Sequence, residues 1–146
     1  MINIRPMRIE DINIVVEYEK LLFGQSLGYD MIRSELIEND FAYYFVLELN
    51  GEFAGYCGCW ITDPNSQIIN LFIIPEFQGR KLGDLLLMHV TTFLASNNVD
   101  LVTLEVRESN FRAQNMYVKH GFKKEYIRKN YYHDGENAIL MIKYFK

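Results

Sequence analysis

The chain has 146 residues, 49% of them hydrophobic and 14% aromatic, which suffices for one well-packed core but not for two ordinary domains. Its formal net charge of −4 argues against general nucleic-acid binding, which needs a concentrated basic face, and weakly favours a cationic substrate. No stretch approaches the ~20 apolar residues of a membrane span, and charged residues interrupt the N-terminal region where a signal peptide would lie. We therefore expect a single domain, residues 1–146, in a soluble cytoplasmic protein.

The N-terminal part of the chain predicts a strand, two helices and a meander of strands. Apolar residues alternate with polar ones at first, and then recur every three or four positions, with Glu19 standing among the apolar positions of the first helix. Asn50-Gly51 is the strongest short signal for a β-hairpin. The predicted elements are a strand at 1–6, helices at 8–22 and 29–37, and strands at 41–49, 52–62 and 67–74, the last three forming an antiparallel meander.

The two cysteines, Cys57 and Cys59, lie on one of these strands and are separated by a single residue. Neighbours this close on one face of a strand make only a strained disulfide. The three histidines show no metal-ligand spacing with them. We expect free thiols, a reducing compartment and no metal ion.

The stretch from Ile68 to Asn97 predicts a strand, a glycine-containing turn and a helix. Free main-chain N–H groups at a helix start point at an anion, the helix dipole adds to their attraction, and Gly79 and Gly83 let a bulky phosphate come close. Two glycines near a helix start also occur without a ligand, and neither the Rossmann nor the Walker phosphate loop is present. We interpret the turn as a phosphate site, with a pyrophosphate as the expected ligand. The expected apolar face of the helix consists of Leu82, Leu85, Leu86, Val90, Phe93 and Leu94.

The remainder predicts a strand, a short helix and two final strands. Residues 101–107 alternate between apolar and polar, as in a strand with one buried face, and this strand should lie parallel to 68–74 after a right-handed crossover. The last elements are a helix at 110–120, capped by Ser109 or Asn110 and followed by Gly121, and strands at 123–131 and 137–144. The predicted fold is α/β, with a mixed, mostly antiparallel sheet of about seven strands and four helices.

One face of the predicted short helix differs from a packing face. Asn110, Ala113 and Tyr117 are offset by three and then four residues, so they lie on the same side of the helix. A packing face would be apolar throughout, whereas this one carries an amide, a small residue and a phenol. It is typical of a face that meets a polar, extended ligand.

The same residues carry a resemblance to a known family. Asn110-x-x-Ala113-x-x-x-Tyr117-x-x-x-Gly121-Phe122, downstream of Gln78-x-x-x-x-Gly83, resembles the GCN5-related N-acetyltransferase (GNAT) superfamily. Within it, Leu104-Glu105-Val106-Arg107-x-Ser109-Asn110 and Arg128-x-Asn130-Tyr131-Tyr132 resemble the bacterial ribosomal-protein-alanine N-acetyltransferases. The resemblance covers essentially the whole chain and agrees with the predicted order of elements.

The resemblance implies acetyl-coenzyme A (acetyl-CoA) as the acetyl donor. In the family, the main chain of the strand before the turn binds the pantetheine arm, and an asparagine matching Asn110 hydrogen-bonds the same arm. The family turn reads Gln/Arg-x-x-Gly-x-Gly/Ala, and in this sequence Lys81 stands at its first glycine. The main-chain N–H donors do not need that glycine if Lys81 is helical. The resemblance assigns the pantetheine arm to Leu71, Phe72 and Ile73, and the pyrophosphate to Gln78, Gly79, Arg80, Lys81, Leu82 and Gly83.

The resemblance also assigns catalytic roles. A neutral amine attacks the thioester, a base takes its proton, and an acid protonates the departing thiolate. Glu105 matches the subfamily's base and Tyr117 the family's general acid; their structural alternatives are a surface glutamate and a core aromatic. We further expect the strand that carries Glu105 to part from its parallel neighbour and admit the thioester.

The acceptor is the least determined part of the prediction. Tyr131 and Tyr132 match positions where the subfamily shapes its peptide groove, although a structural role is also open to them. Leu27-Gly28 stands where ribosomal N-acetyltransferases often carry a Trp-Ser pair. The first hypothesis is acetylation of the N-terminal alanine of a ribosomal protein. The alternatives are a small amine, such as a polyamine, amino acid or aminoglycoside, and a non-catalytic coenzyme A sensor.

Overall fold

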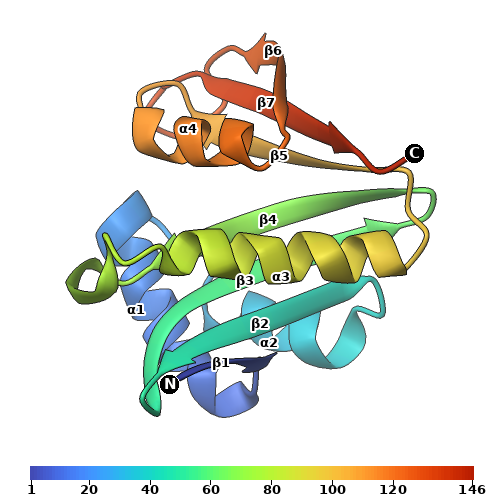
Figure 1. Cartoon of the computed structure of the whole chain (residues 1–146). Coiled ribbons are helices and arrows are strands. Elements are labelled where there is room, and N and C mark those ends of the chain that lie inside the picture. The colour runs from blue at the N-terminus through green and yellow to red at the C-terminus, as the bar shows by residue number, and fades with distance from the viewer.

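One seven-stranded sheet in the order β1-β2-β3-β4-β5-β7-β6 runs through the molecule (Figure 1). The structure is a computed structural model and describes residues 1–146. All neighbouring strands pair antiparallel except β4 and β5, which are parallel. The predicted mixed, mostly antiparallel sheet with four helices is therefore confirmed. The strands are β1 (Ile2–Pro6), β2 (Ala42–Leu49), β3 (Glu52–Thr62), β4 (Asn65–Ile73), β5 (Leu101–Arg107), β6 (Lys123–Arg128) and β7 (Ala138–Tyr144), and the helices are α1 (Ile12–Phe23), α2 (Tyr29–Glu38), α3 (Leu82–Ser96) and α4 (Phe111–Lys119), with short 3-10 helices at Ile9–Asp11 and Pro75–Phe77.

Most predicted boundaries agree with the structure to within two residues. The first helix is an exception, because α1 begins at Ile12 rather than at residue 8 and a 3-10 turn at Ile9–Asp11 precedes it. At the hairpin, Asn50 and Gly51 both have positive φ, 52° and 84°, as the tight turn between β2 and β3 requires. The predicted strand 123–131 ends earlier, at Arg128. Tyr131 and Tyr132 consequently lie in the loop between β6 and β7 rather than at a strand end.

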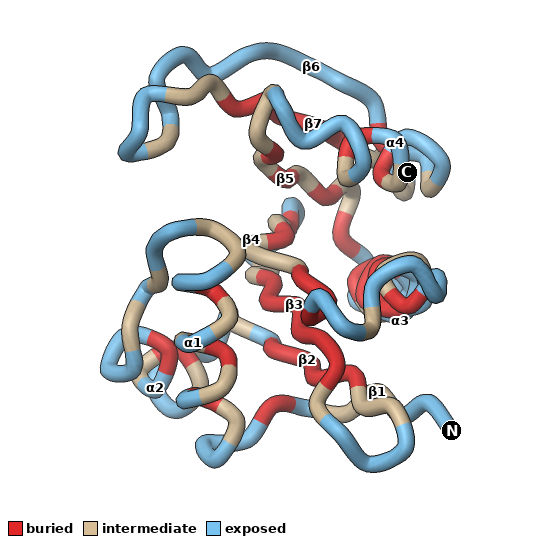
Figure 2. The backbone as a smooth tube through the Cα atoms, turned by 90° about the vertical axis from the view of Figure 1, so that its left-hand side faces the viewer, coloured by how far each residue is buried: buried red, intermediate tan, exposed pale blue.

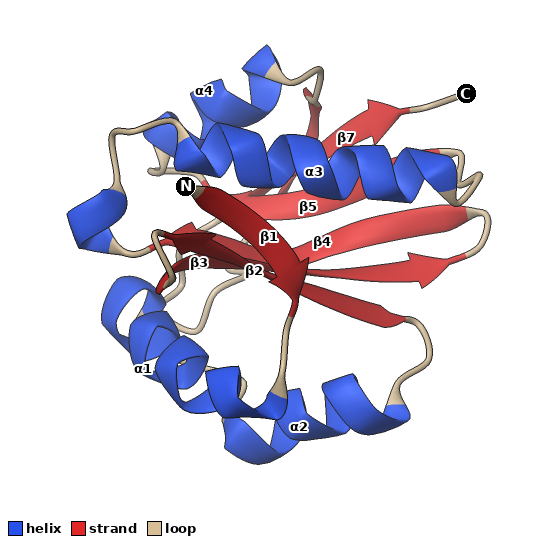
Figure 3. Cartoon of the chain, turned by 60° about the horizontal axis from the view of Figure 1, so that its bottom comes forward, coloured by secondary structure: helices blue, strands red, loops and turns tan.

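The helices cover both faces of the sheet. Figure 3 shows α1 and α2 on one side and α3 and α4 on the other. Each side has its own apolar cluster, the larger one under α3 and α4 and the smaller one under α1 and α2. Figure 2 shows buried residues running through the central strands and α3, whereas β6 is exposed along its length.

The buried face of α3 is displaced from the predicted one. Leu82, Leu86, Val90 and Leu94 are buried as expected, but Leu85 is 39% exposed and Leu87 is fully buried instead. Successive residues of a helix are 100° apart, so Leu87 falls beside Val90 while Leu85 falls outside the buried arc. The prediction for Leu85 was wrong.

The parallel pair β4 and β5 is joined over only a short length. Asn65–Gln67 pairs with Leu101–Thr103, and no partner on β5 faces β4 beyond that point. The register between β3 and β4 shifts so that Ile69 is left without a partner, and such a bulge bends a strand. The expected parting of the two strands is therefore confirmed, and it begins immediately before the apolar run of β4.

Candidate active site

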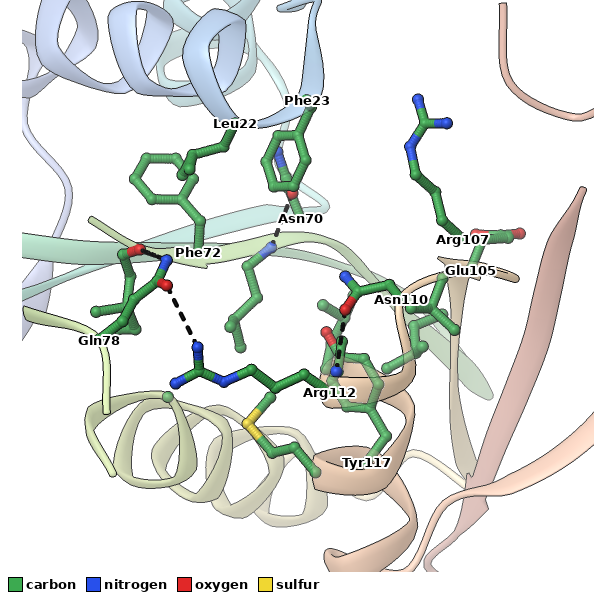
Figure 4. Close-up of a pocket in the computed structure, with 18 of the residues that line it drawn as sticks. Leu22, Phe23, Asn70, Phe72, Gln78, Glu105, Arg107, Asn110, Arg112 and Tyr117 are labelled. Carbon is green, nitrogen blue, oxygen red and sulfur yellow. Dashed lines mark hydrogen bonds between the residues drawn. The ribbon is translucent and has the colours of Figure 1, made fainter. Parts of the chain in front are cut away.

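A cleft of about 1220 Å³ occupies the space where β4 and β5 diverge. Its walls come from β4, the turn before α3, the start of α3, β5 and α4, together with the end of α1 and the loop that follows it. Figure 4 shows side chains from these elements gathered around one opening. The cleft thus joins the two stretches that the sequence singled out.

The strand β4 presents its unpaired edge to the cleft. Leu71, Phe72 and Ile73 all line it, and the edge of the strand that faces β5 has no sheet partner there. The side chain of Gln78 folds back and its Nε2 donates to the Ile73 carbonyl at 2.8 Å. This bond fixes the turn against the end of the strand.

The turn before α3 leaves a helix start without a side-chain cap. Gly79 has a φ of +83°, and Lys81 is left-handed with a φ of +63°. In the sequence analysis, the replacement of the family glycine is acceptable on condition that Lys81 is helical. That condition is not met, because Lys81 takes the left-handed conformation for which glycine is the default residue. The first-turn N–H groups of α3 remain open toward the cleft, since helix starts leave such donors unpaired within the helix.

Gly83 and Arg80 differ in how they stand to the cleft. Gly83 lines the cleft, but a Cβ there would also come within 3.3 Å of the Met116 sulfur, so the glycine permits the close approach of α3 and α4. Arg80 does not line the cleft. Its guanidinium lies 5.5 Å from the centre of the Phe77 ring.

Arg112 was not singled out from the sequence, although it lies inside the Asn110–Ala113 motif. Its Nη1 donates to Gln78 Oε1 at 3.4 Å, and Figure 4 shows the side chain reaching from α4 across the opening. It places a permanent positive charge beside the turn. An arginine one residue before the alanine of the motif was the signal that could have identified it.

Asn110 is the N-cap of α4, which decides between the two predicted caps. Its Oδ1 accepts from the Ala113 N–H at 3.1 Å. Capping uses only the oxygen of the side-chain amide, so the two N–H donors remain available. Asn110, Ala113 and Tyr117 all line the cleft, which confirms that they share one face.

Tyr117 brings a protonated phenol to the cleft. The side chain is only 7% exposed, and its ring packs against Phe122 with centroids 5.7 Å apart. Burial, with smaller contributions from Cys57 and Tyr132, raises the pKa of the Tyr117 hydroxyl well above its usual range, and no hydrogen bond contributes to that shift. The hydroxyl is therefore a proton donor without a partner in the protein.

Glu105 lies on the cleft-facing side of β5, with its side chain 13% exposed and Oε1 3.4 Å from Nε of Arg128. Burial raises the pKa of the Glu105 carboxyl, and the charge of Arg128 opposes this shift without cancelling it. Each effect has the expected sign, because burial disfavours the charged form and a nearby cation favours it.

The loop between β6 and β7 is held in place by Arg107. The Nη1 atom of this guanidinium lies 2.8 Å from Asp134 and 2.9 Å from Glu136, and the group stacks 4.1 Å from the centre of the Tyr132 ring. Tyr131 is 47% exposed at the mouth of the cleft. Burial raises the pKa of Tyr132 to about 12.

The structure also bears on the thiols, on metal binding and on membrane-spanning helices. Cys57 and Cys59 are buried free thiols, and burial raises the pKa of Cys59 to about 12. No group of three or more His, Cys, Asp or Glu side chains is arranged to hold a metal ion. None of the helices combines the length and the apolarity that crossing a bilayer requires.

Comparison with known proteins identifies the family. The sequence profile of the Acetyltransferase (GNAT) family matches residues 13–122. The chain is 42% identical over 139 residues to a Bacillus subtilis protein provisionally named ribosomal protein bS18-alanine N-acetyltransferase, covering 94% of this chain and 92% of that protein.

Solved structures give the same result. The crystal structure of the ribosomal-protein-S18-alanine N-acetyltransferase from Escherichia coli superposes with a TM-score of 0.89 at 28% identity, over 100% of this chain and 95% of that one. An N-acetyltransferase from Thermoplasma acidophilum, solved in complex with coenzyme A, shares the fold with a TM-score of 0.80 at 19% identity, over 99% of each chain. The family profile includes the turn and the α4 motif that line the cleft. The match to the Bacillus subtilis protein, over 94% of this chain, extends beyond residues 13–122 at both ends. This chain belongs to the GNAT family and is an N-acetyltransferase.

Proposed function

We propose that this enzyme transfers the acetyl group of acetyl-CoA to the N-terminal alanine of a ribosomal protein. The single observation that carries the proposal is the cleft between the parted strands β4 and β5, with an open helix start at one end and Glu105 and Tyr117 lining it. The named activities of the Bacillus subtilis and Escherichia coli relatives support this choice of acceptor.

The residues present fit acetyl-CoA. The unpaired edge of β4 at Leu71 to Ile73 offers main-chain groups to the amides of the pantetheine arm, and the amide nitrogen of Asn110 offers two donors from the other side. The open start of α3 suits a pyrophosphate, and Arg112 adds a charge-assisted contact beside it. We assign the pyrophosphate to Gln78 through Gly83, with Arg80 the weakest member because it does not line the cleft.

The proposed reaction is a direct transfer. The α-amino group, with a reference pKa near ~8, attacks the thioester carbonyl; an N–C bond forms and the C–S bond breaks. Glu105 takes the proton that the amine loses, and the hydroxyl of Tyr117 donates a proton to the departing thiolate. A base with a raised pKa accepts this proton more readily, and an acid whose pKa is high stays protonated until it is needed.

Tyr131 and Tyr132 are proposed as acceptor contacts. Both lie at the mouth of the cleft, in a loop pinned by Arg107. The pinning favours a rigid wall, which lowers the entropy cost of holding a peptide. Free buried thiols suit the reducing cytoplasm, where we place both enzyme and acceptor.

The test is an acceptor panel with purified enzyme and acetyl-CoA. The acceptors are peptides that begin with alanine, the same peptides already acetylated at the N-terminus, and polyamines, amino acids and aminoglycosides. The rate is measured as release of the coenzyme A thiol, and mass spectrometry locates the acetyl group on the product. We expect turnover with the free alanine peptides and none with the blocked ones. Faster turnover of a small amine than of every peptide would reject the acceptor, and tight binding of acetyl-CoA without turnover of anything would reject the enzyme in favour of a sensor.

A further inference from the structure

Glu19 is a buried carboxylate that the proposed reaction does not use. It lies on α1 among apolar positions and is only 2% exposed, yet it reaches the wall of the cleft. Burying a carboxylate is costly unless it is well hydrogen-bonded. Glu19 accepts three hydrogen bonds, all from neutral side chains. A group kept at such a cost calls for an explanation.

Each donor to Glu19 comes from a different element. Ser26, in the loop between α1 and α2, donates to Oε1 at 2.6 Å. Tyr56 of β3 and Asn70 of β4 donate to Oε2 at 3.2 and 2.7 Å. Burial and the Glu19 carboxylate raise the pKa of Tyr56, so the phenol remains a donor. One carboxylate thus joins a loop, a helix and two strands.

The connections continue into the main chain at both ends. Ser26 Oγ also accepts from the Gly28 N–H at 3.0 Å, which folds the loop back on itself. Asn70 Oδ1 accepts from the Leu71 N–H at 2.9 Å, and Figure 4 shows Asn70 beneath Leu22 and Phe23 at the end of α1. The chain of bonds therefore runs from the α1–α2 loop to the strand expected to carry the thioester arm.

We propose that Glu19 is a positioning residue that holds the α1–α2 loop, residues 24–28, against β4 and so fixes the acceptor-side wall of the cleft. Gln25, Ser26 and Leu27 of this loop line the cleft, as do Tyr131 and Tyr132 of the loop between β6 and β7. The inference rests on the proposed function for its kinetic readout, but the structural coupling between loop and strand stands apart from it.

Glu35 provides a matched control. It is the other buried glutamate, on α2, and it also accepts three hydrogen bonds, from Asn39, Tyr44 and Trp60 at 2.6, 2.9 and 2.7 Å. Its network does not line the cleft. Removing Glu35 imposes the same kind of loss on the core without touching the loop or β4.

The experiment compares four variants, Glu19→Ala, Glu19→Gln, Ser26→Ala and Glu35→Ala, by steady-state kinetics and by amide exchange followed with NMR. Ser26→Ala, at a half-buried position, removes the tie between the loop and Glu19 together with the bond from the Gly28 N–H, and it leaves the bonds from Tyr56 and Asn70 to Glu19 in place. Losing a hydrogen bond to a charged group should raise the KM for the acceptor peptide roughly tenfold, while the KM for acetyl-CoA stays within about twofold. Glu19→Gln should restore most of the acceptor affinity, because an amide can accept from Asn70 and donate to Ser26.

Amide exchange reports the coupling without any turnover. In Glu19→Ala the amides of Gly28 and Leu71 should both exchange roughly tenfold faster or more, and in Glu35→Ala neither should change although the melting temperature falls. An unchanged acceptor KM in both Ser26→Ala and Glu19→Ala would overturn the inference, as would acceleration of the Leu71 amide alone. Equal kinetic defects in Glu35→Ala would overturn it too, by showing a general loss of stability. A wild-type enzyme inactive on every peptide would instead reject the proposed acceptor, and the exchange data would still decide the role of Glu19.

Discussion

Glu105 and Tyr117 line the same cleft, and burial raises the pKa of both side chains. In the proposed reaction the two shifts serve opposite tasks. An ordinary glutamate has a pKa near ~4.3 and is a weak base toward an ammonium whose pKa is near ~8. A rise narrows that gap, which improves proton transfer. For the phenol, a rise ensures that the proton is present when the thiolate departs.

Glu105→Gln should lower kcat roughly a hundredfold or more, the scale of a lost general base. Glutamine keeps the volume and the burial, so the melting temperature should change little. Initial rates with an alanine peptide measure the effect, and Glu125→Gln, an exposed change on β6, is the control. A Glu105→Gln enzyme with wild-type kcat at all pH values would exclude the base role.

Tyr117→Phe separates the acid role from the packing role. Because the hydroxyl has no partner in the protein, its removal costs no internal hydrogen bond, and the ring still packs on Phe122. We expect kcat to fall roughly tenfold to a hundredfold with an unchanged melting temperature. Tyr144→Phe, at an exposed position, should change neither quantity. Loss of stability without loss of kcat in Tyr117→Phe would assign the residue to the core alone.

Arg128→Gln should shift the pH profile in a direction fixed by electrostatics. Arg128 is the cation that lowers the pKa of Glu105 against the effect of burial, so removing its charge raises that pKa further. The base then stays protonated up to a higher pH. The fall of kcat/KM on the acidic side of the profile should therefore occur at a higher pH, while rates above the pKa of the acceptor amine stay close to wild type. A profile from pH 5 to 9, with the exposed Arg33→Gln as control, measures the shift; a downward movement would contradict the pairing.

The elements show why local pattern predicted most of the fold and where it failed. Alternation in β5 and the Asn50-Gly51 turn act over a few residues, and both were placed correctly. The length over which β4 and β5 pair depends on a bulge at Ile69, which no local pattern indicates. The buried arc of α3 likewise depends on how α3 itself lies on β3 and β4, so periodicity alone misplaced Leu85.

Asn110 tests whether one residue serves an element and a ligand together. Asn110→Ala should cost about 1 kcal/mol of stability through the lost cap of α4 and should also raise the KM for acetyl-CoA. Asn110→Asp restores a capping oxygen but has no N–H donors, so it should recover the melting temperature and leave the KM for acetyl-CoA high. Thermal melts and initial rates decide the matter. Recovery of both quantities in Asn110→Asp would mean that Asn110 acts only as a cap.

At the scale of the whole molecule, the site arises from long-range contacts that sequence spacing does not encode. Resemblance of motifs indicated Glu105, Tyr117 and Asn110, because each lies in a stretch with characteristic spacing. Glu19 and Asn70, which are 51 positions apart in the chain, meet only because α1 packs against β4, where Tyr18 and Phe23 contact Phe72. A glutamate among apolar helix positions was visible in the sequence, but its partners were not.

Acetyl-CoA should bind as a bridge between the two parts of the sheet that β4 and β5 separate. A ligand that binds only the folded state at 100 times its Kd adds about 2.7 kcal/mol, which for a chain of this size raises the melting temperature by about 5–10 °C. The amides of β4 from Ile68 to Ile73 that face β5 have no sheet partner in the free protein. Except for Leu71, whose N–H is bonded to Asn70 Oδ1, they should exchange quickly and become protected when acetyl-CoA is added. Adenosine, which lacks both the pyrophosphate and the pantetheine arm, is the control. It should neither raise the melting temperature as far nor protect the β4 amides. The larger apolar cluster contains residues from both parts of the sheet, so we expect protection to spread to β5 and β7 as well. A rise in melting temperature without protection of the β4 edge would place the ligand outside the cleft.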